Sequence, residues 1–187
     1  MTSLNNIEVN EDLLPRPGSS LYNLNHKDAM IKNKMLKKFK IYNKYIVLPL
    51  YRLKILPLLG FGRLFLILTT QGRKTGKKRR TPLEYRRIDG IITIFSSRGE
   101  AAGWLKNIRA HPDALLVRHG FHCFKPQVEF VTNEEQKLEI MKWYVVNHGK
   151  AAKMLFGWMQ KVDDPETTDF SKMLTMITII RLHHSSD

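Results

Sequence analysis

The chain has 187 residues and a hydrophobic content of 43%, which suits one globular domain with a core of its own, with room for an appendage. The single cysteine, Cys123, excludes an internal disulfide framework and fits a reducing compartment. A formal net charge of +14 implies an acidic partner: nucleic acid, an anionic membrane or a multiply charged small molecule. The first residues are polar and partly acidic and do not resemble a secretory signal, so we expect a cytoplasmic protein.

Three segments are expected: residues 1–25, 26–62 and 63–187. The first contains Pro15, Pro17 and Gly18 and little periodicity, which predicts a flexible arm that orders on the domain or on a second subunit, as in a homodimer. The second begins with a helical pattern from His26 to Ile46. Its apolar residues recur at three- and four-residue spacing and lysines take much of the remaining surface; the apolar residues are Ile31, Met35, Phe39, Tyr42 and Ile46.

Two interpretations of this basic amphipathic helix remain open. It packs on its own domain with solvated lysines, or the segment from Lys32 to Leu59 lies on an anionic membrane surface, at the inner face of the membrane. A transmembrane span is not expected, because Pro49 and Pro57 interrupt the apolar run that continues from the helix.

A β-hairpin is predicted from Leu64 to Tyr85. An apolar strand, Leu64 to Thr70, is followed by a turn with Gly72 and Gly76 and by an alternating strand from Arg79 to Arg87. Six basic residues crowd this turn. Charges of the same sign at such short distances repel one another, so water, salt or a bound polyanion must offset the repulsion. The turn is either a solvated tip or an anion-binding nest, in which both glycines adopt positive φ and the Thr75 hydroxyl adds a donor.

The rest of the chain predicts more strands and a few helices. A third strand, Ile91 to Ser97, precedes a short helix, Ala102 to Ala110, and a hairpin with strands Ala114 to Arg118 and Phe121 to Val131. Pro126 indicates an edge strand or a bulge. A capping box, Thr132 with Glu135, opens a helix that ends at Gly149. A helix over 150–162 and a strand over 173–182 complete a fold that is mainly β with peripheral helices, an antiparallel barrel.

Few residues point to chemistry of their own. His119, His122 and Cys123 are close in sequence, but His122 and Cys123 face opposite sides of a strand and no zinc spacing appears, so no metal is expected. Ser96 and Ser97 end a strand, where they close a loop or donate to a ligand. Trp104 and Asn107 share one side of the short helix, where the tryptophan either fills the core or walls a planar ligand.

The stretch TTQGRKTGKKRRTPLEY resembles the deazaflavin-dependent nitroreductases, which include F420H2-dependent quinone reductases. Further motifs match in order: Ser97-Arg98-Gly99, Trp104, Asn107 and Ala110-His111-Pro112. The resemblance implies an FMN-binding-like split β-barrel and a hydride transfer from reduced coenzyme F420 to a quinone, nitro compound or activated enone. The tail and phosphate of the coenzyme would be held by Arg73, Lys74, Thr75 and Arg79. The deazaflavin would be lined by Pro82, Leu83, Ser96, Ser97, Arg98, Gly99, Trp104 and Asn107, with Ser97 as the hydrogen-bond donor to a developing oxyanion.

Several positions depart from the family pattern. Arg98 replaces a lysine, Glu100 a glycine and Leu105 a tyrosine, and the segment from Gly149 to Phe156 lacks the tyrosines of the nitroreductases. A different substrate is therefore expected. FMN or haem remains an alternative cofactor. The alternative from another class is a non-enzymatic nucleic-acid-binding module; because the basic turn has little aromatic interleaving, no nucleic-acid partner is expected.

Overall fold

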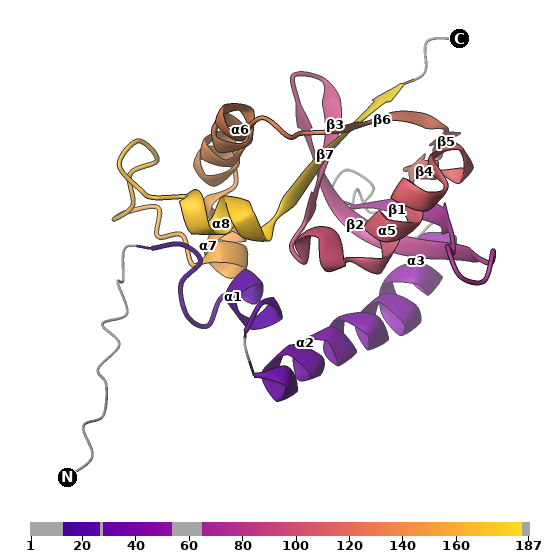
Figure 1. Ribbon diagram of the computed structural model, residues 1–187, viewed down its shortest axis with the longest axis horizontal. Coiled ribbons are helices and arrows are strands. Elements are labelled where there is room, and N and C mark those ends of the chain that lie inside the picture. The colour runs from indigo at the N-terminus through magenta and orange to yellow at the C-terminus, as the bar shows by residue number, and fades with distance from the viewer. Residues whose placement is uncertain (1–12, 27, 54–64, 185–187) are drawn as a thin grey trace.

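The computed structural model describes residues 13–26, 28–53 and 65–184, except the side chains of Phe39 and Arg52. Its strands form one antiparallel sheet of order β5-β4-β1-β2-β3-β7-β6 (Figure 1). Their bounds are β1 Phe65–Gln71, β2 Lys78–Ile88, β3 Ile91–Ser96, β4 Leu116–His119, β5 His122–Phe124, β6 Pro126–Phe130 and β7 Thr178–His184. The predicted first hairpin and third strand are confirmed, apart from Leu64, which lies outside the described residues.

The sheet curls into a split barrel because of two features of the chain. β5 and β6 lie at opposite edges of the sheet, yet only Lys125 separates them in sequence, so the edges must come close. The long strand β2 serves both halves: Lys78 to Glu84 pairs with β1, and Tyr85 to Ile88 pairs with β3. This architecture is the one that the resemblance implied.

The prediction of one strand from Phe121 to Val131 was wrong. β5 pairs with β4 and β6 pairs with β7, and the break falls at Lys125. Pro126 begins β6 because a proline lacks the backbone N–H of an interior ladder position. Phe124 of β5 and Val128 and Phe130 of β6 still pack against the same core despite the break.

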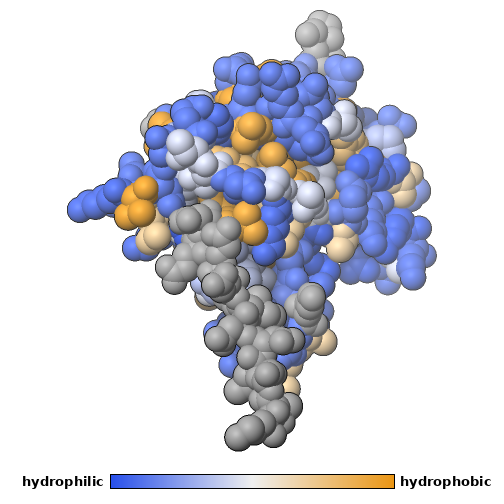
Figure 2. Space-filling view, turned by 60° about the vertical axis from the view of Figure 1, so that its left-hand side comes forward, coloured by the Kyte–Doolittle hydropathy of each residue, from blue (hydrophilic) through white to orange (hydrophobic). Residues whose placement is uncertain are grey.

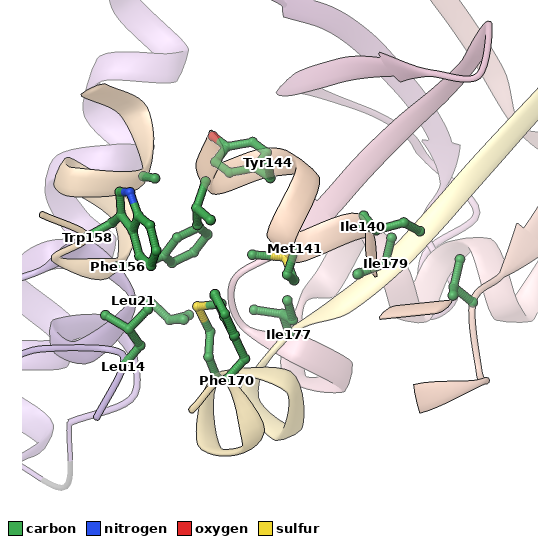
Figure 3. Packing of buried hydrophobic residues seen from close by; sticks show 14 of the residues in the cluster. Leu14, Leu21, Ile140, Met141, Tyr144, Phe156, Trp158, Phe170, Ile177 and Ile179 are labelled. Carbon is green, nitrogen blue, oxygen red and sulfur yellow. The ribbon is translucent and has the colours of Figure 1, made fainter. Parts of the chain in front are cut away.

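Two hydrophobic cores stabilise the molecule. The first fills the barrel and includes Leu66, Leu68 and Ile94 from the strands and the fully buried Leu105 of α5, Gly103–Ala110. The second lies between the sheet and the later helices and includes Met141, Phe156 and Phe170 (Figure 3). Burying each large apolar side chain contributes about 1.5–3 kcal/mol to folding. The barrel end near α5 is therefore a rigid platform.

The described part of the predicted arm packs on the domain. Leu14, and Leu21 of α1, Ser20–Leu24, are fully buried in the second core, where Figure 3 shows them close to Phe170. Arg16 also forms an ion pair with Asp163, with 2.6 Å between Nη1 and Oδ2. Residues 1–12 lie outside the described part.

The basic helix is real but is divided into three pieces. They are α2, Ala29–Tyr42, a π-helical turn, Asn43–Val47, and α3, Leu48–Arg52, and they run along one side of the barrel (Figure 1). Val47 and Tyr51 are buried, and the Tyr51 hydroxyl accepts from Gly120 N at 3.0 Å. The predicted apolar residues Tyr42 and Ile46 stay 55% and 44% exposed. Lys54 to Leu59 lie outside the described residues.

No helix within the described ranges is both long and apolar enough to span a membrane. The face drawn in Figure 2 is mostly hydrophilic, with a hydrophobic area near its centre.

Three helix boundaries differ from those predicted. The helix α6, Glu134–Asn147, is capped by Asn133, which accepts from Gln136 N at 2.9 Å, and not by Thr132. α7, Gly149–Phe156, stops at Gly157 with φ +82°, a left-handed conformation that ends helices, and does not reach Val162. α8, Ser171–Met176, occupies the start of the predicted last strand, because Met173 points into the second core.

Candidate functional site

The turn between β1 and β2 is closed by its own backbone. Gly72 N donates to Lys77 O at 2.9 Å, and Thr75 N and Gly76 N both donate to Gly72 O, at 3.1 and 2.7 Å. Gly76 has φ +64°, as predicted, but the φ of Gly72 is not positive. The predicted nest therefore does not form from these amides, because their hydrogens are already used. An anion at this turn would be bound by side chains.

Asn107 connects the turn to the short helix. The side chain is 7% exposed, its Nδ2 donates to Thr70 Oγ1 at 3.2 Å, and its Oδ1 accepts from Arg73 N at 3.2 Å. One carboxamide thus ties α5 to the end of β1 and to the first residues of the turn. These two bonds position α5 against the hairpin, so Asn107 acts as a positioning residue.

A cavity of about 390 Å³ opens between the turn and α5. Its volume lies within the range of about 300–1,000 Å³ that is usual for small-molecule sites. Three cations, one aromatic wall and several polar groups line it: Gly72, Arg73, Lys74, Thr75, Arg79, Thr81, Gly103, Trp104 and Asn107. No carboxylate is among them, so the cavity suits an anionic ligand.

Six of the predicted site residues meet in this cavity: Arg73, Lys74, Thr75, Arg79, Trp104 and Asn107. Arg73, Lys74 and Arg79 are exposed, and Trp104 is half-buried against the barrel core. The guanidinium groups are free to form the paired hydrogen bonds that they make with phosphates and carboxylates.

The other predicted residues do not line it. Leu83 packs into the barrel core opposite Leu66, and Pro82, its neighbour on β2, faces the other side of the sheet. The Ser96 hydroxyl donates to Gly99 O at 2.9 Å, so it closes the loop after β3.

The loop after β3 runs from the end of that strand to α5. Ser97 O accepts from Asn25 Nδ2 at 3.0 Å. Gly99 has φ +47°, and a Cβ there would lie 2.9 Å from Met176 O. Arg98 Nε is buried and has no hydrogen-bond partner among the described residues, which leaves a donor to be satisfied.

Two lining residues escaped the sequence analysis, Thr81 and Gly103. Thr81 lies two positions after Arg79 on β2, so strand alternation alone places both on one face. Gly103 begins α5 and leaves open space where a side chain would stand. The alternation was the available signal for Thr81; none was available for Gly103.

A polar cluster occupies the other face of β2. Arg86 forms an ion pair with Glu84, whose Oε1 accepts from the Tyr144 hydroxyl at 3.1 Å. Burial, and then the Glu84 charge, raise the pKa of Tyr144, which therefore keeps its proton. These groups brace α6 against the sheet on the side away from Thr81. Within the described ranges, no group of three or more His, Cys, Asp or Glu side chains is arranged to bind a metal ion.

The curled sheet defines a split-barrel protein, and its basic, aromatic-walled cavity suits an anionic small molecule. The family model described as F420H(2)-dependent quinone reductase matches residues 58–150. The chain belongs to this family. It is therefore an oxidoreductase, and its cofactor is coenzyme F420. Among curated proteins, no match is found.

Solved structures of similar proteins include an F420-H2 dependent reductase, with 22% identity over 65% of this chain and 95% of that one and a TM-score of 0.43. A putative pyridoxamine 5′-phosphate oxidase from Listeria innocua shares 16% identity over 71% and 92%, with a TM-score of 0.43. An FAD-binding protein from Mesorhizobium loti shares 17% identity over 66% and 82%, with a TM-score of 0.41.

Proposed function

We propose that this protein catalyses hydride transfer from reduced F420 to a quinone, with nitro compounds and activated enones as further acceptors, and that the coenzyme occupies the cavity beside α5. The observation that carries this proposal is the meeting of Arg73, Lys74 and Arg79 with Trp104 in one cavity. When bound, the deazaflavin supplies the hydride, so no protein nucleophile is needed.

The residues fit an anionic coenzyme with a planar ring. Arg73, Lys74 and Arg79 bind the phosphate and carboxylates of the tail, and the Thr75 hydroxyl donates to them. Trp104 provides an apolar wall for the ring. Asn107 holds Arg73 and α5 in register. The cations therefore face the ligand from a fixed frame.

The loop after β3 completes the site in this proposal. The buried Arg98 Nε lacks a partner, and a bound coenzyme or acceptor would satisfy it. No hydrogen bond of the Ser97 hydroxyl to any described residue is found, which keeps it free to donate to an acceptor oxygen that gains negative charge. Pro82, Leu83, Ser96 and Gly99 do not line the cavity, so in this proposal they support the strand and loop that carry the binding groups.

The departures from the family pattern support a distinct acceptor. Glu100 is bound by Arg109, with 2.9 and 2.7 Å between the guanidinium and the carboxylate, and Leu105 is fully buried. Both replacements therefore serve local structure. The α7 segment that lacks tyrosines packs Ala152 and Phe156 into the second core and leaves Met154 62% exposed, and it is the place where acceptor preference would change.

The test is a titration of the purified chain with F420 and with FMN, followed by fluorescence. We expect F420 to bind and FMN to bind weakly or not at all. Oxidation of reduced F420 is then followed by absorbance with a naphthoquinone, a nitroaromatic and a cyclic enone. Tight FMN binding without F420 binding would overturn the cofactor site, and turnover with the nitroaromatic alone would overturn the quinone assignment.

We also propose that the segment from α2 to α3 lies on an anionic bilayer, where a lipophilic quinone is available, which makes the protein peripheral on the cytoplasmic face. Residues 29–47 carry six lysines and no acidic residue. Met30 and Tyr45 are 77% and 65% exposed. Apolar and basic groups together suit an anionic surface. Co-sedimentation with anionic and neutral vesicles tests this: pelleting with neither would remove the proposal.

A further inference from the structure

A second cavity, of about 500 Å³, lies at the seam of the barrel. It is lined by Arg87, His119, His122, Cys123, Phe124 and His184, so it shares no residue with the coenzyme cavity. These residues come from the ends of β2, β4 and β7 and from all of β5, which the curling of the sheet brings together. A cavity of this size takes a small molecule.

The charged and titratable groups of this cavity are basic, apart from the Cys123 thiol. Arg87 is always charged, and the three imidazoles add donors to it. A nearby carboxylate, Glu129, bonds to His183 Nε2 at 2.6 Å. His183 precedes His184 on β7 and points to the other side of the strand, so this carboxylate does not neutralise the cavity.

His119 is hydrogen-bonded to a neighbour inside the barrel. The Tyr85 hydroxyl is hydrogen-bonded to His119 Nε2, and their rings meet edge to face with centroids 5.0 Å apart. Burial, and then the charges of Arg87, His122 and His184, lower the pKa of His119. Either ring nitrogen of His119 can carry the proton of the neutral imidazole, and the protonated imidazole donates from both.

One wall of the cavity is flat. The rings of Phe124 and His184 stack with centroids 3.9 Å apart and an angle of 19° between their planes. Phe124 comes from β5 and His184 from β7, so this pair spans the seam between the sheet edges. An aromatic face beside cationic donors suits a ligand with a flat apolar part and an anionic group.

We propose that this cavity is a second ligand site, for a small organic oxyanion whose phosphate or carboxylate meets Arg87 and the imidazoles and whose flat part lies against Phe124. It is independent of the coenzyme site. An oxyanion beside Arg87 and the imidazoles offsets their positive charge and stabilises the protonated form of His119, so a proton is taken up on binding.

The experiment is an NMR titration of the full chain with inorganic phosphate and with phenyl phosphate, read at the histidine imidazole resonances. We expect His119, His122 and His184 to shift and His26 and His148 to stay, and phenyl phosphate to act at lower concentration than phosphate because of the flat wall. The affinity should rise as the pH falls through the lowered pKa of His119, by up to about tenfold per pH unit when one proton is taken up.

Two variants separate this site from the other one. Arg87→Gln should abolish the imidazole shifts and leave F420 affinity unchanged. Arg79→Gln should weaken F420 binding and leave the imidazole shifts unchanged. Imidazole shifts that survive Arg87→Gln, or that appear in none of the three cavity histidines, would overturn the proposal. Shifts that depend on protein concentration and not on phosphate would also overturn it, because the wall would then be a contact between copies of the chain.

Discussion

Adjacent arginines on β2 allow the coenzyme cavity to be tested against the overall positive charge. Arg79 lines the cavity and pairs across the hairpin with Thr70, whereas Arg80 pairs with Thr69 and does not line it. Both side chains are exposed, so Arg79→Gln and Arg80→Gln remove the same charge at nearly the same place.

The expected loss follows from the kind of bond removed. A hydrogen bond to a charged group contributes about 1.5–3 kcal/mol when it is well formed, and exposure and salt reduce it, since the Debye length is about 10 Å at 0.1 M. We expect Arg79→Gln to cost about 1–2 kcal/mol of F420 binding, a factor of about 5–30. Arg80→Gln loses only long-range attraction, which should be a factor of about two at this salt concentration.

The assay is a fluorescence titration of both variants with F420 at 0.1 M and 0.5 M salt. The difference between the variants should persist at high salt, because a direct contact is screened less than a distant charge. Equal losses for the two arginines, which vanish together at high salt, would show that only net charge attracts the coenzyme. The placement of the tail at Arg79 would then be wrong.

Three further changes test the frame around the site. Asn107→Ala leaves the hydroxyl and the amide that it joins without a partner; we expect a loss of about 1–3 kcal/mol in the free energy of unfolding by denaturant, together with weaker F420 binding. Gly99→Ala should lower Tm, because the new Cβ would stand 2.9 Å from a carbonyl oxygen at φ +47°, whereas Gly103→Ala, with open space, should not. The hydrogen bond from Arg16 lowers the pKa of Asp163 in the folded protein. The ion pair therefore stabilises the fold above the unfolded pKa near 4, and this stabilisation is lost as the pH falls from there through the lower folded pKa. Asp163→Asn should lower the free energy of unfolding by about 3 kcal/mol at pH 7 and weaken its dependence on acid pH.

Most strands of the barrel could be predicted from the sequence, because the residue patterns that indicate them are local. Alternating residues and a Gly-bearing turn predict β1, β2 and β3, and each of these strands pairs with its neighbour in sequence. The division between β5 and β6 could not be predicted from the sequence, because it depends on the distant strand with which each of them pairs. The proline at position 126 marked the place but not the outcome.

For the proposed coenzyme cavity, the sequence likewise predicted which residues are present but not how they are hydrogen-bonded. Residue type indicated that Arg73 and Arg79 bind anions, and both line the cavity. It did not indicate that the backbone amide of Arg73 is already bonded to Asn107, or that the amides of the turn bond to each other. Hydrogen bonds inside a turn decide whether its amides are available to a ligand, and they depend on backbone geometry that the sequence only constrains.

The two cavities are connected by one strand, and its geometry explains why they are separate. Arg79, Thr81, Leu83, Tyr85 and Arg87 alternate along one face of β2. Arg79 lines the first cavity and Arg87 the second, and at about 3.4 Å per residue a straight strand would separate their backbones by at most roughly 27 Å. Leu83 fills the core between them. Because charges this far apart are screened and their neighbours do not overlap, each end of β2 can be altered without disturbing the ligand at the other.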